Sequence, residues 1–269
     1  MIHLLGHYLR RSILGILIGS VGLFAFTIFA GRMFQRITER AGNSRSLTRM
    51  MPKWMQNAFQ IESFSLDSIN GFLAIILQHP FLLSILLILP IALITAFFTG
   101  DVEKRTLAMV LTRPISRLAV AVSVFAVVAG SLLVLIGVIA AGITISARQT
   151  GLTAELNLDL LLQALINLTL LIFAFTGIGA AVSTLTTLRG DAVGWCLTIV
   201  LVMYVWNFLS QIWGETAPLP NYSLFHFYPP ADIMIKGMTS DTNLAILAGT
   251  GAAGWLVAFV VFRLRNFSI

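Results

Sequence analysis

Residues 81–117 read FLLSILLILPIALITAFFTGDVEKRTLAMVLTRPISR, an apolar run that ends in a short island of mixed charge. The run Phe81–Phe98 contains no charged residue. At about 1.5 Å per residue it is long enough, as a helix, to cross most of a hydrocarbon core about 30 Å thick. The island Thr99–Arg117 carries acidic and basic side chains, and a second long apolar run follows it. This alternation predicts membrane-spanning helices joined by a polar connection.

The composition of the whole chain agrees with this prediction. Of 269 residues, 58% are hydrophobic and only 10% are charged, whereas soluble domains carry about 25% charged residues. The formal net charge is +6. Because the basic residues stand almost wholly between apolar runs, orientation in the membrane and contact with anionic lipid headgroups explain them better than nucleic acid does.

The apolar runs predict an all-α polytopic membrane protein with six transmembrane helices in a single domain, 1–269. Gln78-His79-Pro80 predicts a break, so that the second span proper would be 81–98. Arg189-Gly190-Asp191 predicts a tight turn between two spans. The first run exceeds the apolar region of a signal peptide, about 7–15 residues, and is interpreted as an uncleaved helix. The expected spans are about 13–30, 72–98, 118–145, 160–188, 192–213 and 244–262.

Two polar segments flank the first span. Residues 1–11 predict an amphipathic helix at the membrane interface, with Ile2, Leu5 and Leu9 on its apolar face. His3 and His7 have an i, i+4 spacing that could bind a metal, but no third ligand is near, so no metal site is predicted.

The first connection is strongly basic from Arg32 to Lys53, and a helix is expected to continue past the bilayer there. This segment either contacts headgroups or attracts an anionic ligand. With the N-terminus inside, nine basic residues fall inside and eight outside, so loop charge alone does not orient the chain.

Motifs for chemistry are missing from the sequence. The three lysines are followed by Trp54, Arg105 and Gly237, so the chain has no Walker A motif. The single cysteine, Cys196, stands in an apolar run and is expected to be a small buried side chain. We therefore predict no enzymatic activity, no catalytic residue and no cofactor in this chain.

Neutral amides are the main polar groups predicted inside the spans. They form two pairs spaced i, i+4, Gln163 with Asn167 and Asn207 with Gln211. Such amides either hydrogen-bond neighbouring helices or line a translocation path. Full charges are absent from the span interiors, which disfavours an ion-coupled pump.

The charged island predicts a short amphipathic helix from Asp101 to about Thr112. Asp101 could cap this helix, and an acidic first turn suits the positive end of the helix dipole. Leu107, Val110 and Leu111 would form one apolar face. Glu103, Arg105 and Thr106 would remain for contact with another protein.

The sequence resembles the ABC-2 type membrane subunits, or permeases, of ABC transporters. The resemblance rests on Glu103-Lys104-Arg105-Thr106-Leu107 and on Leu111-Thr112-Arg113-Pro114-Ile115-Ser116-Arg117. Phe262-Arg263-Leu264-Arg265 is similar to the family's closing motif. Arg105 stands where the family usually has glycine, and Asn266 where it commonly has aspartate.

This resemblance implies that the island is a cytoplasmic coupling helix and that both termini are cytoplasmic, in a prokaryotic plasma membrane. It implies two copies of a separate ABC ATPase, which would bind ATP and Mg, and a second or homologous permease. Export is the direction implied. The residues it places in ATPase coupling are Asp101, Glu103, Lys104, Arg105, Thr106, Arg113 and Arg117.

An alternative function is a membrane scaffold or assembly protein without a transport path. Such a protein would share the helices but would not need an ATPase, so a co-purifying subunit with a Walker A motif discriminates between the two.

Overall fold

The computed structural model describes residues 2–41, 68–104, 116–213 and 222–265. Within these ranges the chain is helical, and six helical stretches are long and apolar enough to cross a membrane. The prediction of an all-α polytopic membrane protein is therefore confirmed. The elements are α1 (Ile2–Ala41), α4 (Ile69–Gln78), α5 (Pro80–Thr95), η2 (Ala96–Gly100), α6 (Asp101–Glu103), α8 (Arg117–Gln149), α9 (Leu158–Leu185), α10 (Arg189–Trp213), η5 (Leu224–Phe227), α11 (Pro230–Lys236) and α12 (Asp241–Leu264).

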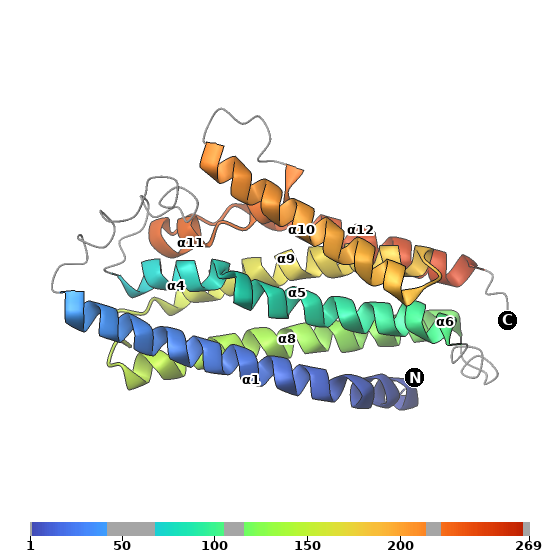
Figure 1. Ribbon diagram of the computed structural model, residues 1–269, viewed down its shortest axis with the longest axis horizontal. Coiled ribbons are helices and arrows are strands. Elements are labelled where there is room, and N and C mark those ends of the chain that lie inside the picture. The colour runs from blue at the N-terminus through green and yellow to red at the C-terminus, as the bar shows by residue number, and fades with distance from the viewer. Residues whose placement is uncertain (1, 42–67, 105–115, 214–221, 266–269) are drawn as a thin grey trace.

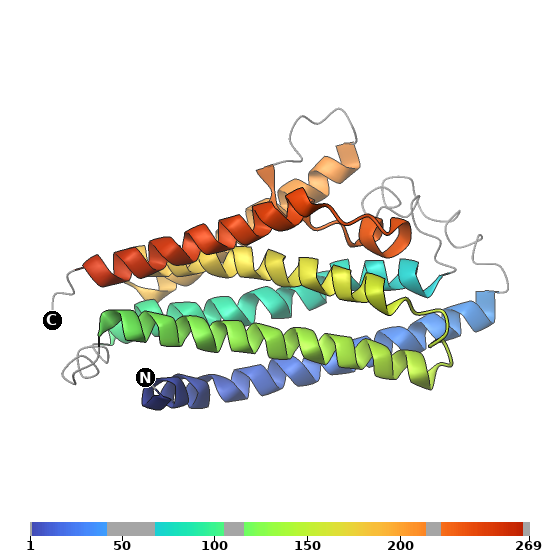
Figure 2. The ribbon, with the colours of Figure 1, turned by 180° about the vertical axis from the view of Figure 1, so that it is seen from behind.

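Helices α1 and α8 form one tightly packed pair, side by side in Figures 1 and 2. Gly31 lies against Ser146 and Gly142 lies against Thr27, so closely that a Cβ atom at either glycine would collide with the opposing side chain. Small residues at a crossing let two membrane helices approach and gain van der Waals contact. The pair therefore behaves as one packed unit.

Helices α9 and α12 form a second pair through direct contact between backbones. A Cβ atom at Gly177 would collide with the backbone of Gly251, and one at Gly254 would collide with the backbone of Gly177. Beside this crossing the indole nitrogen of Trp255 donates to the Thr176 hydroxyl at 3.4 Å.

Helix α5 packs against members of both pairs. On the α1 side it meets Gly15, Gly19 and Gly22, where an added Cβ would lie 3.4–3.5 Å from the side chains of Ile85 or Leu89. The small residues on this face of α1 thus leave room for the side chains of α5.

The predicted break in the second span is confirmed at His79. His79 has an extended backbone, and its Nδ1 accepts from the Phe81 N–H at 3.2 Å, which caps the start of α5. The next residue, Pro80, occupies the first turn, where its missing N–H costs nothing. From there the helical run reaches Glu103, 24 residues in all, or about 36 Å of rise.

The prediction that Asp101 caps the start of a new helix was wrong, because Asp101 continues a helical run that is already formed. Helix α6 follows η2 directly, and the residue before it, Gly100, has helical dihedral angles and no side-chain cap. Asp101 therefore lies near the end of the membrane helix that starts at Pro80. The remainder of the predicted coupling helix, residues 105–115, lies outside the described residues.

Two further boundaries differ from the prediction. The N-terminal segment is continuous with the first span in α1, and its buried side chains are Leu4 and Tyr8, whereas Leu9 is half exposed. Arg189, predicted to lie in a turn, is the first residue of α10. The expected continuation of the first helix past the predicted span 13–30 is confirmed, because α1 runs to Ala41.

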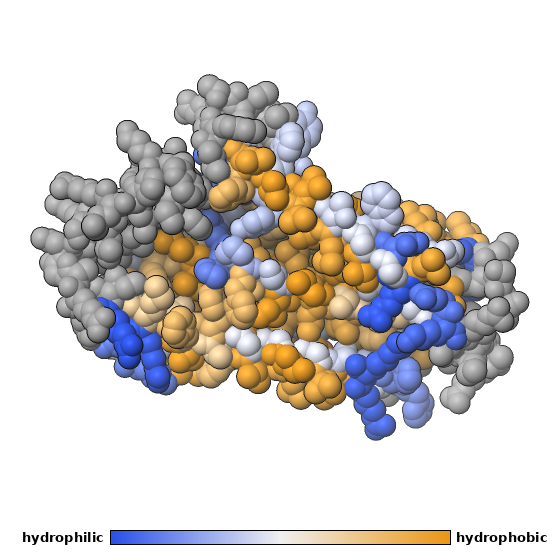
Figure 3. Space-filling model, in the orientation of Figure 1, coloured by the Kyte–Doolittle hydropathy of each residue, from blue (hydrophilic) through white to orange (hydrophobic). Residues whose placement is uncertain are grey.

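The two termini lie at the same end of the bundle as α6 and the α9–α10 turn (Figures 1 and 2). At the opposite end lie the C-terminal end of α1, the helices α4 and α11, and the α8–α9 connection (Figure 1). Figure 3 shows apolar side chains over the middle of the molecule and hydrophilic ones toward both of its ends. The end that holds the termini and α6 carries polar contacts between segments far apart in the chain.

Candidate functional site: polar contacts around residues 105–115

An ion pair joins the first turns of α1 to the end of the long helical run. Arg11 Nη1 lies 2.5 Å from Asp101 Oδ1, and Asp101 is only 5% exposed. The guanidinium carbon of Arg11 also lies 5.5 Å from the centroid of the Phe97 ring. A buried carboxylate needs a cation and hydrogen bonds to offset its lost hydration, and Arg11 supplies both.

The same helical run is tied to the junction of α9 and α10. Glu103 Oε2 accepts from the backbone N–H of Arg189 at 2.7 Å, so an anion lies at the N-terminus of α10, where the helix dipole favours it. The Thr99 hydroxyl donates to the carbonyl of Ser183 at 2.7 Å, close to the end of α9. Both contacts join segments more than eighty residues apart.

Two arginines make further contacts in this region: Arg265 at the C-terminal end of α12 and Arg117 at the start of α8. Arg265 Nη1 donates to the carbonyls of Thr184 and Thr186, at 2.5 and 2.9 Å. These carbonyls belong to the end of α9, where a cation is favoured. Arg117 Nη1 in turn donates to the carbonyl of Arg265 at 2.5 Å.

We call Arg11, Asp101, Glu103, Arg117 and Arg265 the loop base. They join the described residues on both sides of 105–115 to helices α1, α9, α10 and α12. The described residues that flank 105–115 are thus joined to these four helices through polar contacts.

The sequence-predicted residues fall into four groups here. Asp101 is buried and faces Arg11, whereas Glu103 and Lys104 are exposed. Arg117 is partly buried and bonded to α12. Arg105, Thr106 and Arg113 lie outside the described residues.

Sequence reasoning missed Arg11 and Arg265 as members of the site. Arg11 was counted only as a basic residue that flanks a span, and Arg265 as such a residue and as part of the closing motif. Their distance along the chain from their partners gave no signal for pairing. A weak signal was available, since Asp101 follows a fully apolar run and a carboxylate in that position requires a nearby cation.

The amides predicted inside the spans occupy different environments. Gln163 Oε1 accepts from the Thr239 hydroxyl at 2.5 Å, and Asn167, which is 1% exposed, donates to the carbonyl of Phe227 at 3.4 Å. These contacts favour a role in packing. Asn207 and Gln211 on α10 are partly exposed. A translocation path through the four residues stays a prediction.

A segment at the opposite end folds back onto the bundle. The Tyr228 hydroxyl donates to the carbonyl of Leu77 at 3.2 Å, near the break after α4. Burial raises the pKa of Tyr228, which keeps its hydroxyl protonated as a donor. The Ser223 hydroxyl donates to the carbonyl of Met203 at 2.7 Å. Together with Asn167, these contacts hold η5 and α11 against α4, α9 and α10.

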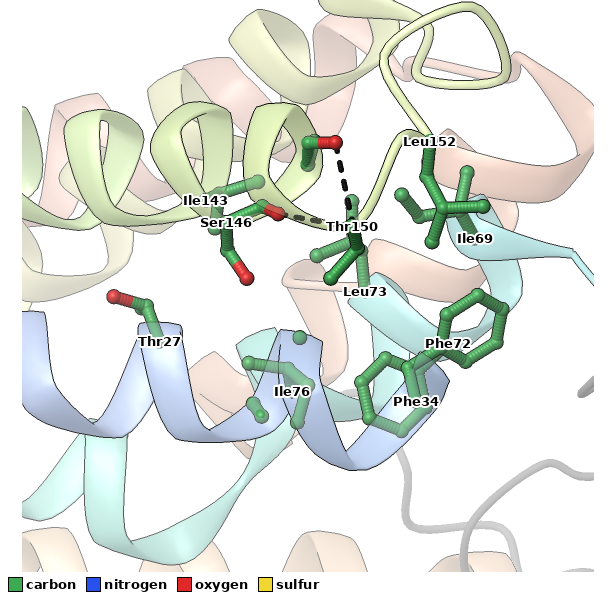
Figure 4. Close-up of a pocket in the computed structure, with 13 residues that line it drawn as sticks. Thr27, Phe34, Ile69, Phe72, Leu73, Ile76, Ile143, Ser146, Thr150 and Leu152 are labelled. Carbon is green, nitrogen blue, oxygen red and sulfur yellow. Dashed lines mark hydrogen bonds between the residues drawn. The ribbon is translucent and has the colours of Figure 1, made fainter. Parts of the chain in front are cut away.

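A cavity of about 20 Å³ lies between α1, α4 and α8 (Figure 4). Thr27 and Ser146 face each other across it, and Phe34, Phe72 and Leu152 close its far side. The Ser146 hydroxyl has no hydrogen-bond partner among the described residues. Such a space accommodates about one water molecule, so it is a packing defect rather than a substrate site.

Among the described residues, no group of three or more His, Cys, Asp or Glu side chains is arranged to hold a metal ion. Cys196 is 2% exposed and its Sγ lies 3.9 Å from the carbonyl of Gly179, within the helix packing.

The fold and these contacts define a multi-pass helical membrane protein in which charged side chains join the helices at the end that holds the termini. A family model described as "ABC-2 family transporter protein" matches residues 9–264. The chain therefore belongs to the ABC-2 family of transporter proteins, and its family role is that of a membrane permease, not of the ATPase. No match was found among curated proteins.

Proposed function

We propose that this chain is the permease subunit of an ATP-driven exporter and that residues 101–117 receive movement from a separate ATPase. The observation that carries this proposal is the loop base. It joins the residues on both sides of 105–115 to four helices through charged hydrogen bonds. A segment held in this way transmits displacement to the bundle, whereas an unattached loop would absorb it.

The proposed orientation places both termini and residues 101–117 in the cytoplasm of a prokaryotic cell, with the chain in the plasma membrane. The termini and α6 share one end of the bundle (Figure 1), so a cytoplasmic segment 101–117 would place both termini in the cytoplasm. The charges of the loops do not decide between the two orientations.

In the proposed cycle, two ATPase subunits bind ATP and Mg and close on each other. Their closure displaces the segment 101–117 of each of two permease copies, and the copies rotate to expose a path between them. The ATPase must bind this segment with different affinity in the two states, because otherwise its closure could not shift the equilibrium. Glu103 and Lys104, both exposed, are the described residues placed to contact it.

The first experiment is co-purification of the tagged chain from its native membrane. A stoichiometric subunit with a Walker A motif is the expected result. Its repeated absence under mild detergent conditions would favour the alternative, a membrane scaffold or assembly protein.

The second experiment measures ATPase activity and transport of the complex in proteoliposomes. The double substitution Glu103→Ala with Arg105→Ala should leave the chain in the membrane but abolish its stimulation of the ATPase. The matched control is Asp232→Ala with Lys236→Ala, which removes an exposed ion pair of 2.7 Å from the opposite end. Equal activity of the two double variants would refute the role of residues 101–117.

A further inference from the structure

The Arg11–Asp101 pair connects two parts of the chain that are ninety residues apart. Asp101 lies close to the C-terminal end of the helical run Pro80–Glu103, where the helix dipole disfavours an anion. It is also 5% exposed, so water cannot hydrate it well. Both effects make a cationic partner necessary for an ionised Asp101.

The guanidinium group of Arg11 is suited to hold Asp101 in a fixed geometry. Arg11 meets the carboxylate at 2.5 Å and also lies over the Phe97 ring, 5.5 Å from its centroid. A guanidinium group can bind a carboxylate and an aromatic face at once, which an ammonium group does less well. Tyr8, one turn earlier in α1, packs on the same ring with a centroid distance of 4.6 Å.

Asp101, which the sequence placed among the ATPase-coupling residues, is buried and paired with Arg11. Its neighbours Glu103 and Lys104 are exposed and remain available for contact with another protein. Asp101 therefore acts within the bundle, on α1.

Helix α1 is in turn packed against α8. Gly31 and Gly142 lie so close to Ser146 and Thr27 of the opposing helix that neither position has room for a Cβ atom, and the two helices are in contact along their length. A displacement of α6 that reaches Arg11 would thus move α1 and α8 together.

We propose that Arg11 is a positioning residue for energy coupling. Its pair with Asp101 holds α6 in register with the α1–α8 unit, so that the ATPase moves that unit when it displaces residues 101–117. This inference rests on the proposed function, but it concerns a different element, the first turns of α1.

The direct test measures the distance between α1 and α6 during the ATPase cycle. Spin labels are placed at His7→Cys, an exposed position of α1, and at Val102→Cys, a partly exposed position of α6 that is not assigned to ATPase contact, in a Cys196→Ala background of the complex with its co-purified ATPase. The distance distribution should be the same without nucleotide and in the ATP-trapped state. A shift larger than the width of the distribution would show that α1 and α6 move separately and would overturn the proposal.

Substitutions then test the pair itself. Arg11→Gln should broaden the spin-label distribution and lower permease-dependent ATPase stimulation about tenfold, within the usual range of coupling free energies. Arg11→Lys should retain part of the stimulation, and the exchange Arg11→Asp with Asp101→Arg should restore part of it. Arg10→Ala, a change at the neighbouring exposed arginine, is the control and should match the wild type.

Two results separate this inference from the proposed function. If the wild-type complex shows no permease-dependent ATPase stimulation, the proposed function fails, and the nucleotide-free spin-label distance still reports whether Arg11 holds α6. If the wild type stimulates the ATPase and Arg11→Gln does so equally with an unchanged distance distribution, the role of Arg11 is refuted while the proposed function stands.

Discussion

At the scale of single residues, the hydroxyl of Tyr228 shows how the segment around α11 is held. It donates to the carbonyl of Leu77 at 3.2 Å, and Tyr228 is only 4% exposed. Helix α4 ends at Gln78, so the carbonyls of its last turn lack helical partners. The tyrosine satisfies one of these carbonyls away from water.

Tyr228→Phe should therefore destabilise the protein by about 1–3 kcal/mol, the cost of a buried acceptor that loses its donor. Thermal unfolding in detergent, followed by tryptophan fluorescence, measures the change. Tyr222→Phe is the matched control because Tyr222 is 73% exposed. Equal unfolding midpoints for the two variants would contradict the assigned contact.

Substitution of Glu103 should affect ATPase stimulation more than it affects the stability of the fold. Its contact with the N–H of Arg189 is exposed, so Glu103→Ala should cost only about 0.3–1 kcal/mol, the range for a charge at a helix terminus. The same variant should lower ATPase stimulation in the complex. A large fall in the unfolding midpoint would instead mean that Glu103 is chiefly structural.

At the scale of elements, the glycine crossing of α9 and α12 determines how closely these helices approach. Gly254 lies against the backbone of Gly177, which cannot yield as a flexible side chain would. In lipid, helix association depends on such van der Waals contact, because burial of apolar surface brings no gain from expelled water.

Gly254→Ala should therefore destabilise the protein by about 1–3 kcal/mol through overpacking. Gly249→Ala, one turn earlier on the same helix, is the control, because no atom lies within 4 Å of its added Cβ. Detergent unfolding midpoints measure both. A Gly254→Ala protein as stable as the control would show that the helices can separate without cost.

At the scale of the whole molecule, the topology places the loop base at one end of the bundle and α4, α11 and the α8–α9 connection at the other (Figure 1). Loop charge alone left the orientation undecided. The shared position of the termini and α6 makes the proposed orientation testable with a single pair of sites.

Cysteines at Lys104 and Glu155, both exposed, probe the two ends in a Cys196→Ala background. A membrane-impermeant maleimide should label position 155 in intact spheroplasts and position 104 only in inside-out vesicles. Labelling of position 104 in intact spheroplasts would reverse the proposed orientation.

The hydropathy of the sequence was sufficient to predict the helical class and the six spans, because backbone groups in hydrocarbon must be satisfied within a helix. The triplet Gln78-His79-Pro80 was sufficient to predict the break between α4 and α5. The short motifs Glu103–Leu107 and Leu111–Arg117 were sufficient for the family resemblance. These features depend on local order along the chain, which a sequence displays directly.

Only the tertiary structure decided which residues meet. Asp101, expected to cap a new helix and face a partner, is buried against Arg11, and Glu103 caps α10 rather than a helix of its own. Arg265 binds the end of α9. These ion pairs and helix-end hydrogen bonds form because packing brings their partners together. The packing depends in part on glycine contacts between helices that are far apart in the chain, which the order of residues does not display.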